Sequence, residues 1–156
     1  MSKIVSKYME CYVYREETGV NKYLLLKRSP DKHPYPGIWQ IVTGRIEENE
    51  AAYNTALREV KEETGLKIEK LFVLPKTGSF YTVHTDSIHM IPLFLVKTND
   101  SGVKLSSEHT EYEWSKYENA REKIHWYNQK ENLDLIEEMT ANPELKSTFV
   151  EIKINN

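Results

Sequence analysis

Cysteine, an excess of charge and long apolar runs are all scarce in this chain. Its 156 residues contain one cysteine, Cys11, so no intrachain disulfide can form and a zinc site would need histidine and carboxylate ligands instead. The net charge of −3 lacks the basic excess with which proteins hold long nucleic acids, and no run of lysine or arginine replaces it. We therefore expect no polymeric nucleic-acid partner, although a small phosphate ligand stays open.

Membrane-spanning segments are also missing from the sequence pattern. Residues 1–14 carry lysines but no continuous apolar stretch, and nowhere do about 18 apolar residues run together. We expect no membrane partner and a cytoplasmic location. The 39% hydrophobic and 29% charged residues are typical of a folded chain. A chain of this length buries about two-thirds of its unfolded surface as one compact unit, so a single domain over residues 1–156 is expected.

Strand patterns occupy much of the chain. Residues 5–14 and 23–26 are rich in β-branched, aromatic and aliphatic side chains and flank turn residues 17–21, which predicts a hairpin. Three prolines make residues 29–37 a loop, because proline cannot continue a helix or a central strand. The remaining predicted strands lie at 38–42, 67–74, 78–83, 88–97 and 111–115, with a turn at 99–102.

Two segments predict helices. Residues 50–64 have an apolar face and end at Gly65, which predicts a left-handed cap. Residues 128–140 place aliphatic side chains near helical spacing, which predicts a second helix packed on the sheet. The alternation of polar and apolar residues at 147–154 suits a final edge strand.

Three glutamates share one side of the first predicted helix. Glu59, Glu62 and Glu63 stand at i, i+3 and i+4, so their carboxylates project within a sector of about 100°. Like charges at this spacing repel one another, which favours a cation among them. Carboxylate oxygens suit Mg²⁺ or Mn²⁺, which take few protein carboxylates and fill their other positions with water or phosphate oxygens. The alternative is a solvated helix face, the usual environment of glutamates.

The spacing of the surrounding residues decides between these two interpretations. Five residues separate Gly44 from Glu50, and seven more lead to the pair Arg58-Glu59. The specified positions are Gly44, Glu50, Arg58, Glu59, Val60, Glu62, Glu63, Gly65 and Leu66. This segment resembles the Nudix box, with each of the defining positions filled. The resemblance implies an α+β fold, an α/β/α sandwich in which a loop, helix and loop lie against a mixed β-sheet.

The same resemblance implies a role for each residue of the segment. The three helix glutamates match metal-binding glutamates, and the carbonyl of Gly44 matches a backbone metal ligand. Mg²⁺ is the implied cofactor, and Mn²⁺ is expected to substitute for it. Glu50 and Arg58 match a pair whose salt bridge braces the helix, so they support the site without taking part in the chemistry.

A polyphosphate repels an attacking nucleophile, which sets the requirements for the reaction. A divalent cation neutralises phosphate charge and lowers the pKa of a bound water, and a carboxylate must then accept the proton of that water. The box offers Glu62 for this catalytic role, while family members often draw an additional glutamate from a distant loop. Glu108, just before the predicted strand at 111–115, is the best placed candidate, with a plain surface charge as the alternative.

The substrate is indicated by resemblance outside the box. Residues 38–44 and 108–114, followed by Trp126, resemble the dihydroneopterin-triphosphate diphosphatase branch of the family, which releases pyrophosphate and commonly accepts dATP-like nucleotides. This implies hydrolysis of a nucleoside or pterin triphosphate to the monophosphate and pyrophosphate. A dinucleoside polyphosphate or a nucleotide sugar is the alternative substrate. A non-catalytic regulator is the alternative class, but such proteins typically lose box glutamates or carry a DNA-binding segment, and this chain does neither.

Four residues are candidates for contacts with the small-molecule polyphosphate. Lys27 and Arg28 end a predicted strand near the metal loop, where cations can hold phosphates, although exposed strand-end charges are common. Trp39 and Trp126 lie beside the motifs and are favoured to stack on a flat heterocycle, although aromatic residues more often lie in the core. The sequence shows no interface, so a monomer and a homodimer both stay open.

Overall fold

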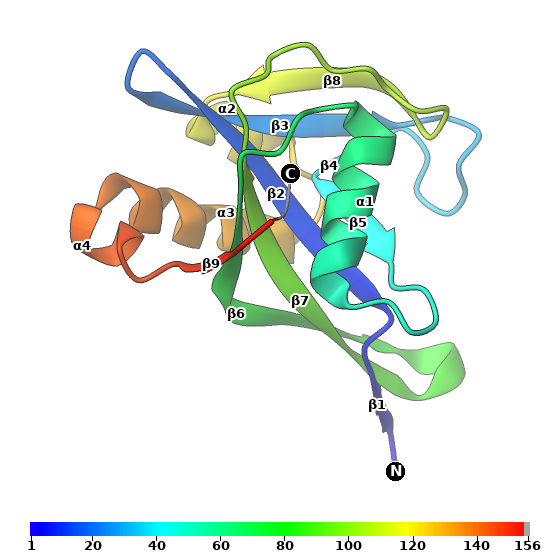
Figure 1. Ribbon diagram of the computed structural model, residues 1–156. Helices are drawn as coiled ribbons and strands as arrows, with labels where there is room; N and C mark the ends of the chain where they lie inside the picture. Colours follow the sequence, from blue (N-terminus) through cyan, green and yellow to red (C-terminus); the bar gives the residue numbers. More distant parts are fainter. Residues whose placement is uncertain (155–156) are drawn as a thin grey trace.

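The computed structural model describes residues 1–154, which form one mixed β-sheet with helices on both faces (Figure 1). The strands are β1 (Lys3–Val5), β2 (Tyr8–Glu17), β3 (Val20–Arg28), β4 (Trp39–Gln40), β5 (Val42–Arg45), β6 (Lys70–Thr82), β7 (Ser87–Lys97), β8 (His109–Ser115) and β9 (Val150–Ile152). The helices are α1 (Ala52–Thr64), α2 (Tyr117–Lys123), α3 (Tyr127–Ala141) and α4 (Pro143–Lys146), with a 3₁₀ turn η1 (Val83–Thr85). None of the helices within residues 1–154 combines the length and apolarity that a membrane crossing requires.

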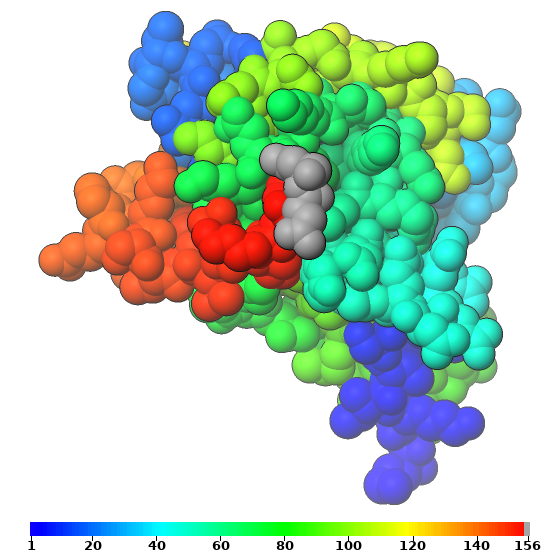
Figure 2. Space-filling model, in the orientation of Figure 1, coloured from blue at the N-terminus to red at the C-terminus, as the bar shows by residue number. Residues whose placement is uncertain are grey.

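The sheet is mixed because its central pair, β2 and β7, runs parallel while most other neighbours are antiparallel. The strand order is β4-β3-β2-β7-β6-β9, with β5 also beside β2, β8 beside β3 and β1 beside β7. Strand β1 extends beyond the body of the molecule (Figure 2). Strand β2 pairs with β3, β5 and β7, so it joins the two halves of the sheet.

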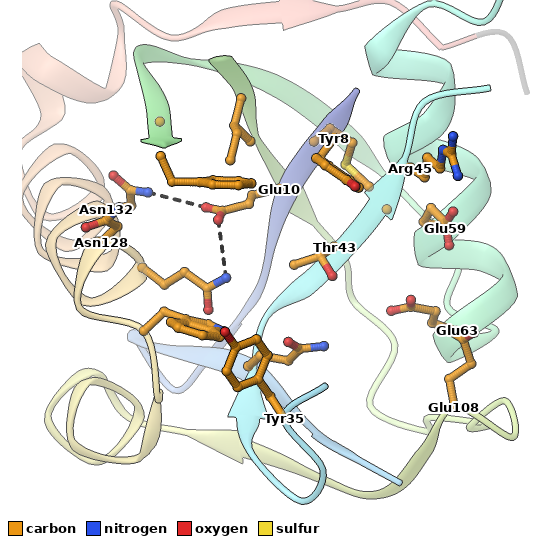
Figure 3. A pocket seen from close by; sticks show the side chains of 18 of the residues that line it. Tyr8, Glu10, Tyr35, Thr43, Arg45, Glu59, Glu63, Glu108, Asn128 and Asn132 are labelled. Carbon is orange, nitrogen blue, oxygen red and sulfur yellow. Dashed lines mark hydrogen bonds between the residues drawn. The ribbon is translucent and has the colours of Figure 1, made fainter. Parts of the chain in front are cut away.

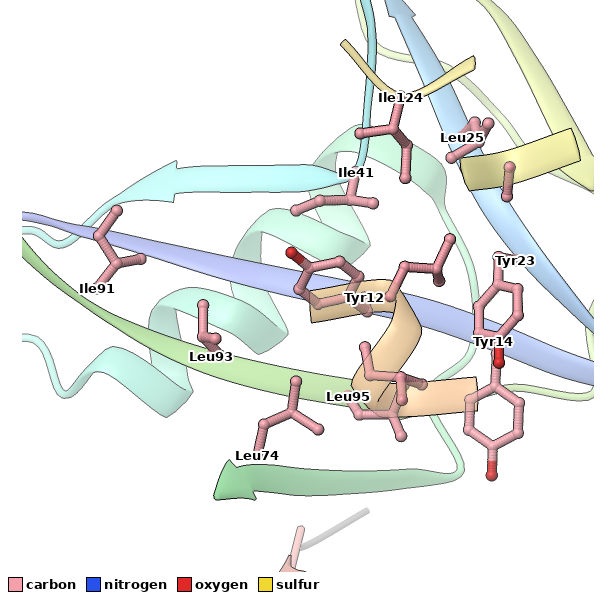
Figure 4. Close-up of a cluster of buried hydrophobic side chains, with 13 residues drawn as sticks. Tyr12, Tyr14, Tyr23, Leu25, Ile41, Leu74, Ile91, Leu93, Leu95 and Ile124 are labelled. Carbon is pink, nitrogen blue, oxygen red and sulfur yellow. The ribbon is translucent and has the colours of Figure 1, made fainter. Parts of the chain in front are cut away.

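Alternation along β2 supplies two apolar cores, one on each face of the sheet. Cys11 and Val13 pack in the cluster that includes Ala56 and Val60 of α1. Tyr12 packs in the other cluster, with side chains of β3, β7, α2 and α3 (Figure 4). Helices therefore cover both faces, which confirms the predicted α+β fold and its α/β/α layers.

Helix α1 ends where the sequence predicted. Gly65 has a φ of 67°, and its N–H donates to the carbonyl of Lys61 at 2.9 Å, so the predicted left-handed cap is present. The helix begins at Ala52 rather than at residue 50. Glu50 lies just before it, and its carboxylate turns back to accept the backbone N–H of Glu47 at 3.1 Å.

The second half differs from the sequence prediction in one of its strands and in its short helices. The strands predicted at 67–74 and 78–83 are one long strand, β6, whose pairing with β7 shifts between Val73 and Thr77. Pro75 lies within this irregularity, where a residue without an N–H can be accommodated in a sheet. Helix α2 was not predicted, because its seven residues are too few for a periodic apolar pattern to emerge.

Candidate active site

A cleft of about 1010 Å³ brings together residues from both halves of the chain. One end, here called the acidic end, is formed by Gly44, Glu59, Glu62, Glu63 and Glu108. The other, here called the polar end, is formed by Glu10, Tyr35, Trp126, Asn128, Gln129 and Asn132. Strands β2 and β5 contribute the lining between them, and Figure 3 shows the two groups facing each other across the cleft.

The three glutamates of α1 differ in their surroundings although they share one helix turn. Glu63 is 5% exposed, whereas the side chain of Glu62 is 59% exposed. The Oε2 atom of Glu63 is buried and has no hydrogen-bond partner in the part of the chain that the structure describes. Burial, followed by the charges of Glu59 and Glu108, raises the pKa of Glu63 to about 9. This carboxylate therefore lies where a cation would satisfy both its charge and its unpaired oxygen.

Gly44 of β5 lies against the side chain of Glu59. A Cβ atom on residue 44 would lie 2.4 Å from Cγ of Glu59 and 2.9 Å from its Oε1, distances that side chains do not adopt. The missing side chain of Gly44 thus lets the backbone of β5 and the carboxylate of α1 approach closely. Such an approach is what a site needs if a backbone carbonyl and a carboxylate are to share a ligand.

Glu108 joins the acidic end from a loop far away in the sequence. The loop is attached to the end of α1, since the N–H of Ser106 donates to the carbonyl of Glu63 at 3.3 Å. Lys32 Nζ lies 3.1 Å from Oε1 of Glu108. The charge of Glu108 contributes to the raised pKa values of both Glu59 and Glu63, so all three carboxylates act within one electrostatic field.

Arg58 and Glu50 brace the start of α1 and do not line the cleft. Arg58 Nε donates to Oε1 of Glu50 at 2.9 Å and Nη2 to Oε2 at 3.0 Å, a two-pronged pair. Thr55 Oγ1 adds a bond of 2.7 Å to Glu50. Arg58, and then Thr55, hold the pKa of Glu50 at about 2. Arg58 Nη1 also contacts Glu59 Oε1 at 2.8 Å, so the brace extends to the acidic end.

The donors of the acidic end fit Mg²⁺. Among residues 1–154, no three acidic, histidine or cysteine side chains converge closely enough to enclose a cation by themselves. Mg²⁺ does not need such an enclosure, because it usually binds through one or two carboxylates and keeps water or phosphate oxygens in its other positions. The buried and unpaired Glu63 carboxylate, with the backbone of Gly44 close to Glu59, supplies hard oxygen donors of this kind.

The four residues predicted to contact substrate lie in different places. Trp126 lines the cleft, and its ring meets that of Tyr35 edge-on at 4.7 Å between centroids. Lys27 and Trp39 are not among the lining residues. Lys27 pairs with Glu111 at 2.6 Å and lies over the Trp39 ring, while Trp39 packs against the core beside α2 and α3.

Arg28, the other predicted strand-end cation, also lies outside the lining residues. Its Nη2 donates to the carbonyl of Pro34 at 3.3 Å. Its charge nevertheless lowers the pKa of Glu63, so Arg28 lies within electrostatic reach of the acidic end.

Apart from Trp126, the residues of the polar end were missed by the sequence prediction. Glu10 accepts hydrogen bonds from Gln129 Nε2 at 3.3 Å, from Asn132 Nδ2 at 3.4 Å and from the hydroxyl of Tyr12 at 3.0 Å. One signal for it was present in the sequence, since Glu10 is a lone charge within the strand run of residues 9–14. The two amides stand at i and i+3 on a helix, a spacing that places them on one face.

The acidic end places the glutamates of α1 beside Gly44 of β5 at one end of the cleft. This arrangement is suited to metal-assisted hydrolysis. A family model described as the NUDIX domain matches residues 9–136, which include both ends of the cleft. The chain belongs to the Nudix family, whose members are hydrolases that act on phosphoric anhydrides. The predicted family and reaction class are therefore confirmed.

Two curated relatives illustrate the match in sequence. The octanoyltransferase of Myxococcus xanthus is 32% identical over 111 residues, which cover 66% of this chain and 29% of that protein. This chain thus corresponds to less than a third of that relative. The nucleoside triphosphatase NudI of Escherichia coli is 30% identical over 104 residues, which cover 62% of this chain and 74% of NudI.

Two solved structures illustrate the match in fold. The Ap4A hydrolase of C. elegans, in a binary complex, aligns with a TM-score of 0.73 and 25% identity over 88% of this chain and 98% of its own. The dihydroneopterin triphosphate pyrophosphohydrolase of E. coli aligns with a TM-score of 0.66 and 24% identity over 84% of this chain and 96% of its own. Both share the α/β/α arrangement that the sequence predicted.

Proposed function

We propose that this chain hydrolyses a nucleoside or pterin triphosphate, such as dihydroneopterin triphosphate or a dATP-like nucleotide, to the monophosphate and pyrophosphate in an Mg²⁺-dependent reaction. One observation carries the proposal: the acidic end and the polar end lie in a single cleft of about 1010 Å³. A cleft of this size can hold a heterocycle and a polyphosphate together. Two of the similar proteins, the nucleoside triphosphatase NudI and the dihydroneopterin triphosphate pyrophosphohydrolase, are named for triphosphate substrates, which supports the proposal.

The acidic end would hold the cation through Gly44, Glu59, Glu62 and Glu63, and Mn²⁺ is expected to substitute for Mg²⁺. When bound, the cation supplies neutralisation of phosphate charge and a lowered pKa for water. Arg28, within electrostatic reach of Glu63, is the strand-end cation best placed to face phosphates. Lys27 and Trp39 have no such place in the proposal, because both lie outside the cleft lining, where Lys27 pairs with Glu111 and lies over the Trp39 ring.

Proton transfer is the part of the reaction that the protein itself must perform. The water oxygen forms a bond to phosphorus, the anhydride bond to the leaving pyrophosphate breaks, and a carboxylate accepts the proton. Glu62 is the most exposed of the three helix glutamates, which suits a base that must reach water. Glu108 is the second candidate, since it enters the same cleft from the opposite loop.

Substitution of the two candidate bases tests the proposal. Glu62→Gln and Glu108→Gln each remove one proton acceptor, and loss of one general base typically slows a reaction by about 100-fold to 10,000-fold. Pyrophosphate release is measured with Mg²⁺ and saturating triphosphate. Glu48→Gln, an exposed glutamate before α1 that does not line the cleft, is the matched control. Wild-type rates in both test variants would show that the assigned chemistry is wrong.

A dinucleoside polyphosphate is the second candidate substrate, favoured by the similarity to the Ap4A hydrolase. A panel of dihydroneopterin triphosphate, the four dNTPs, ADP-ribose and diadenosine tetraphosphate separates the possibilities by product. Pyrophosphate is released from the triphosphates but not from a nucleotide sugar. Tight binding of a ligand with no turnover at any Mg²⁺ concentration would instead support a non-catalytic regulator.

A further inference from the structure

Two buried amide oxygens at the polar end of the cleft have no hydrogen-bond partner among residues 1–154. Gln129 is 3% exposed and Asn132 is 1% exposed, yet Oε1 of Gln129 and Oδ1 of Asn132 are both unpaired. Both residues line the cleft. Unpaired buried polar atoms are rare in folded proteins because each costs about 1–3 kcal/mol, so this pair indicates a ligand that donates hydrogen bonds.

The orientation of the two amides follows from Glu10. Its carboxylate accepts the amide N–H groups of Gln129 and Asn132 (Figure 3). It also accepts the hydroxyl of Tyr12. Asn132 Nδ2 lies 3.1 Å from the Tyr12 hydroxyl as well. Because the amide nitrogens of Gln129 and Asn132 are the atoms that donate to Glu10, the two amide oxygens are the atoms left for other partners. The cluster therefore leaves two amide oxygens, Oε1 of Gln129 and Oδ1 of Asn132, as acceptors for a ligand.

We infer that Glu10, Gln129 and Asn132 read the edge of the substrate heterocycle and select rings that present two adjacent N–H donors. This inference rests on the proposed function and specifies its substrate class. A 2-amino-4-oxopyrimidine edge, as in guanine and in pterins, has a ring N–H beside an amino group. Adenine presents one amino group beside a ring nitrogen that only accepts, and that nitrogen would face an acceptor oxygen. An unmet donor or a facing pair of acceptors weakens binding of the wrong ring.

Aromatic side chains also line the cleft in which the ring of the substrate would bind. Tyr35 and Trp126 meet edge-on, and Phe80 lines the same cleft. These apolar surfaces exclude water from around a flat ring, and hydrogen bonds in such a setting discriminate more strongly than they do in water.

A pair of nucleotides that differ by one donor gives the sharpest test. The value of kcat/KM is measured with Mg²⁺ for dGTP, for dITP, which lacks only the 2-amino group, for dATP and for dihydroneopterin triphosphate. The wild type is expected to prefer dGTP over dITP and over dATP by about 10-fold to 100-fold, the range set by one unmet buried hydrogen bond. Comparison of kcat/KM for dihydroneopterin triphosphate and for dGTP shows which of the two rings that share this edge is the better substrate.

A variant then tests whether the cluster causes the preference. Gln129→Met keeps the side-chain length but removes the free oxygen, so the ratio of kcat/KM for dGTP to that for dITP is expected to fall toward one. Glu138→Gln, an exposed position on the same helix, is the control. Thermal unfolding checks that Gln129→Met is folded, and if it is not, the wild-type substrate comparison still decides.

Each outcome bears on a different claim. Equal wild-type turnover of dGTP, dITP and dATP, or a preference for dATP, overturns the inference but leaves the proposed function standing. A wild-type preference for dGTP that is unchanged in a folded Gln129→Met variant also overturns the assignment to this cluster. Absence of turnover with every triphosphate overturns the proposed function itself.

Discussion

Replacing Gly44 with alanine perturbs the acidic end through a single methyl group. The new Cβ would lie 2.4 Å from Cγ and 2.8 Å from Cδ of Glu59, so the glutamate side chain must rotate away. Rotation breaks the 2.8 Å ion pair between Glu59 and Arg58 and moves one carboxylate from the position expected to bind the cation. The backbone of β5 is held in the sheet by its pairing with β2 and cannot easily move instead.

The expected size of the effect follows from what is displaced. Displacing a group that positions a metal typically lowers metal affinity by about 10-fold to 100-fold. Overpacking costs about 1–3 kcal/mol of stability, which a folded variant can tolerate. We therefore expect the Mg²⁺ concentration for half-maximal activity to rise by that factor in Gly44→Ala, measured by titrating Mg²⁺ at fixed triphosphate. Gly102→Ala is the control, because a Cβ on Gly102 meets nothing within 4 Å.

A double-mutant cycle identifies the cause. Glu59→Ala removes the side chain that clashes, so adding Gly44→Ala to Glu59→Ala should cost little further Mg²⁺ affinity. Two results would refute the reasoning. One is an unchanged Mg²⁺ titration in a folded Gly44→Ala variant, and the other is full additivity of the two substitutions.

Three further predictions concern stability. The pKa of Glu50, held at about 2 by Arg58 and Thr55 against an ordinary value of 4.5, means that its stabilising effect is present above pH 4.5 and is lost as the pH falls toward 2. Urea midpoints of Glu50→Gln and wild type should therefore differ at pH 7 and converge on acidification. Glu63→Gln should raise the melting temperature in EDTA, because it removes a buried acid with an unpaired oxygen, and should abolish the stabilisation by Mg²⁺ that is expected of the wild type. Leu95→Ala, at 0% exposure, should cost about 2–5 kcal/mol in denaturant unfolding, whereas Val83→Ala, at 70% exposure, should cost less than about 0.5 kcal/mol.

The acidic end could be predicted because most of its information is local in the sequence. The glutamates of α1 lie within five residues of one another, and helical geometry alone places them together. Gly65 marks the end of the helix for a similarly local reason, since glycine adopts its left-handed conformation without strain. The pairing of Arg58 with Glu50 followed from resemblance rather than from spacing, because Glu50 lies before the helix.

Apart from Trp126, the polar end could not be predicted, because its members are far apart in the sequence. Glu10 and Gln129 are 119 positions apart, and only the packing of α3 on the sheet brings them together. Trp39 shows the converse, since its closeness to a motif in the sequence suggested a cleft residue while the structure packs it against the core. Local spacing therefore identified the chemistry, whereas the recognition surface depended on tertiary structure.

Strand β2 has a consequence for which bond of a substrate is cut. Glu10 lies opposite Thr43 in the β2–β5 register, and the next pair, Met9 opposite Gly44, leads to the acidic end. Neighbouring strands keep a nearly constant spacing of about 4.8 Å. The sheet therefore holds the polar end and the acidic end of the cleft at a fixed separation. A substrate whose ring is bound at the polar end should then be hydrolysed at a fixed distance from that ring. Adding phosphates to the far end of its chain should lengthen the released fragment without changing which bond is hydrolysed.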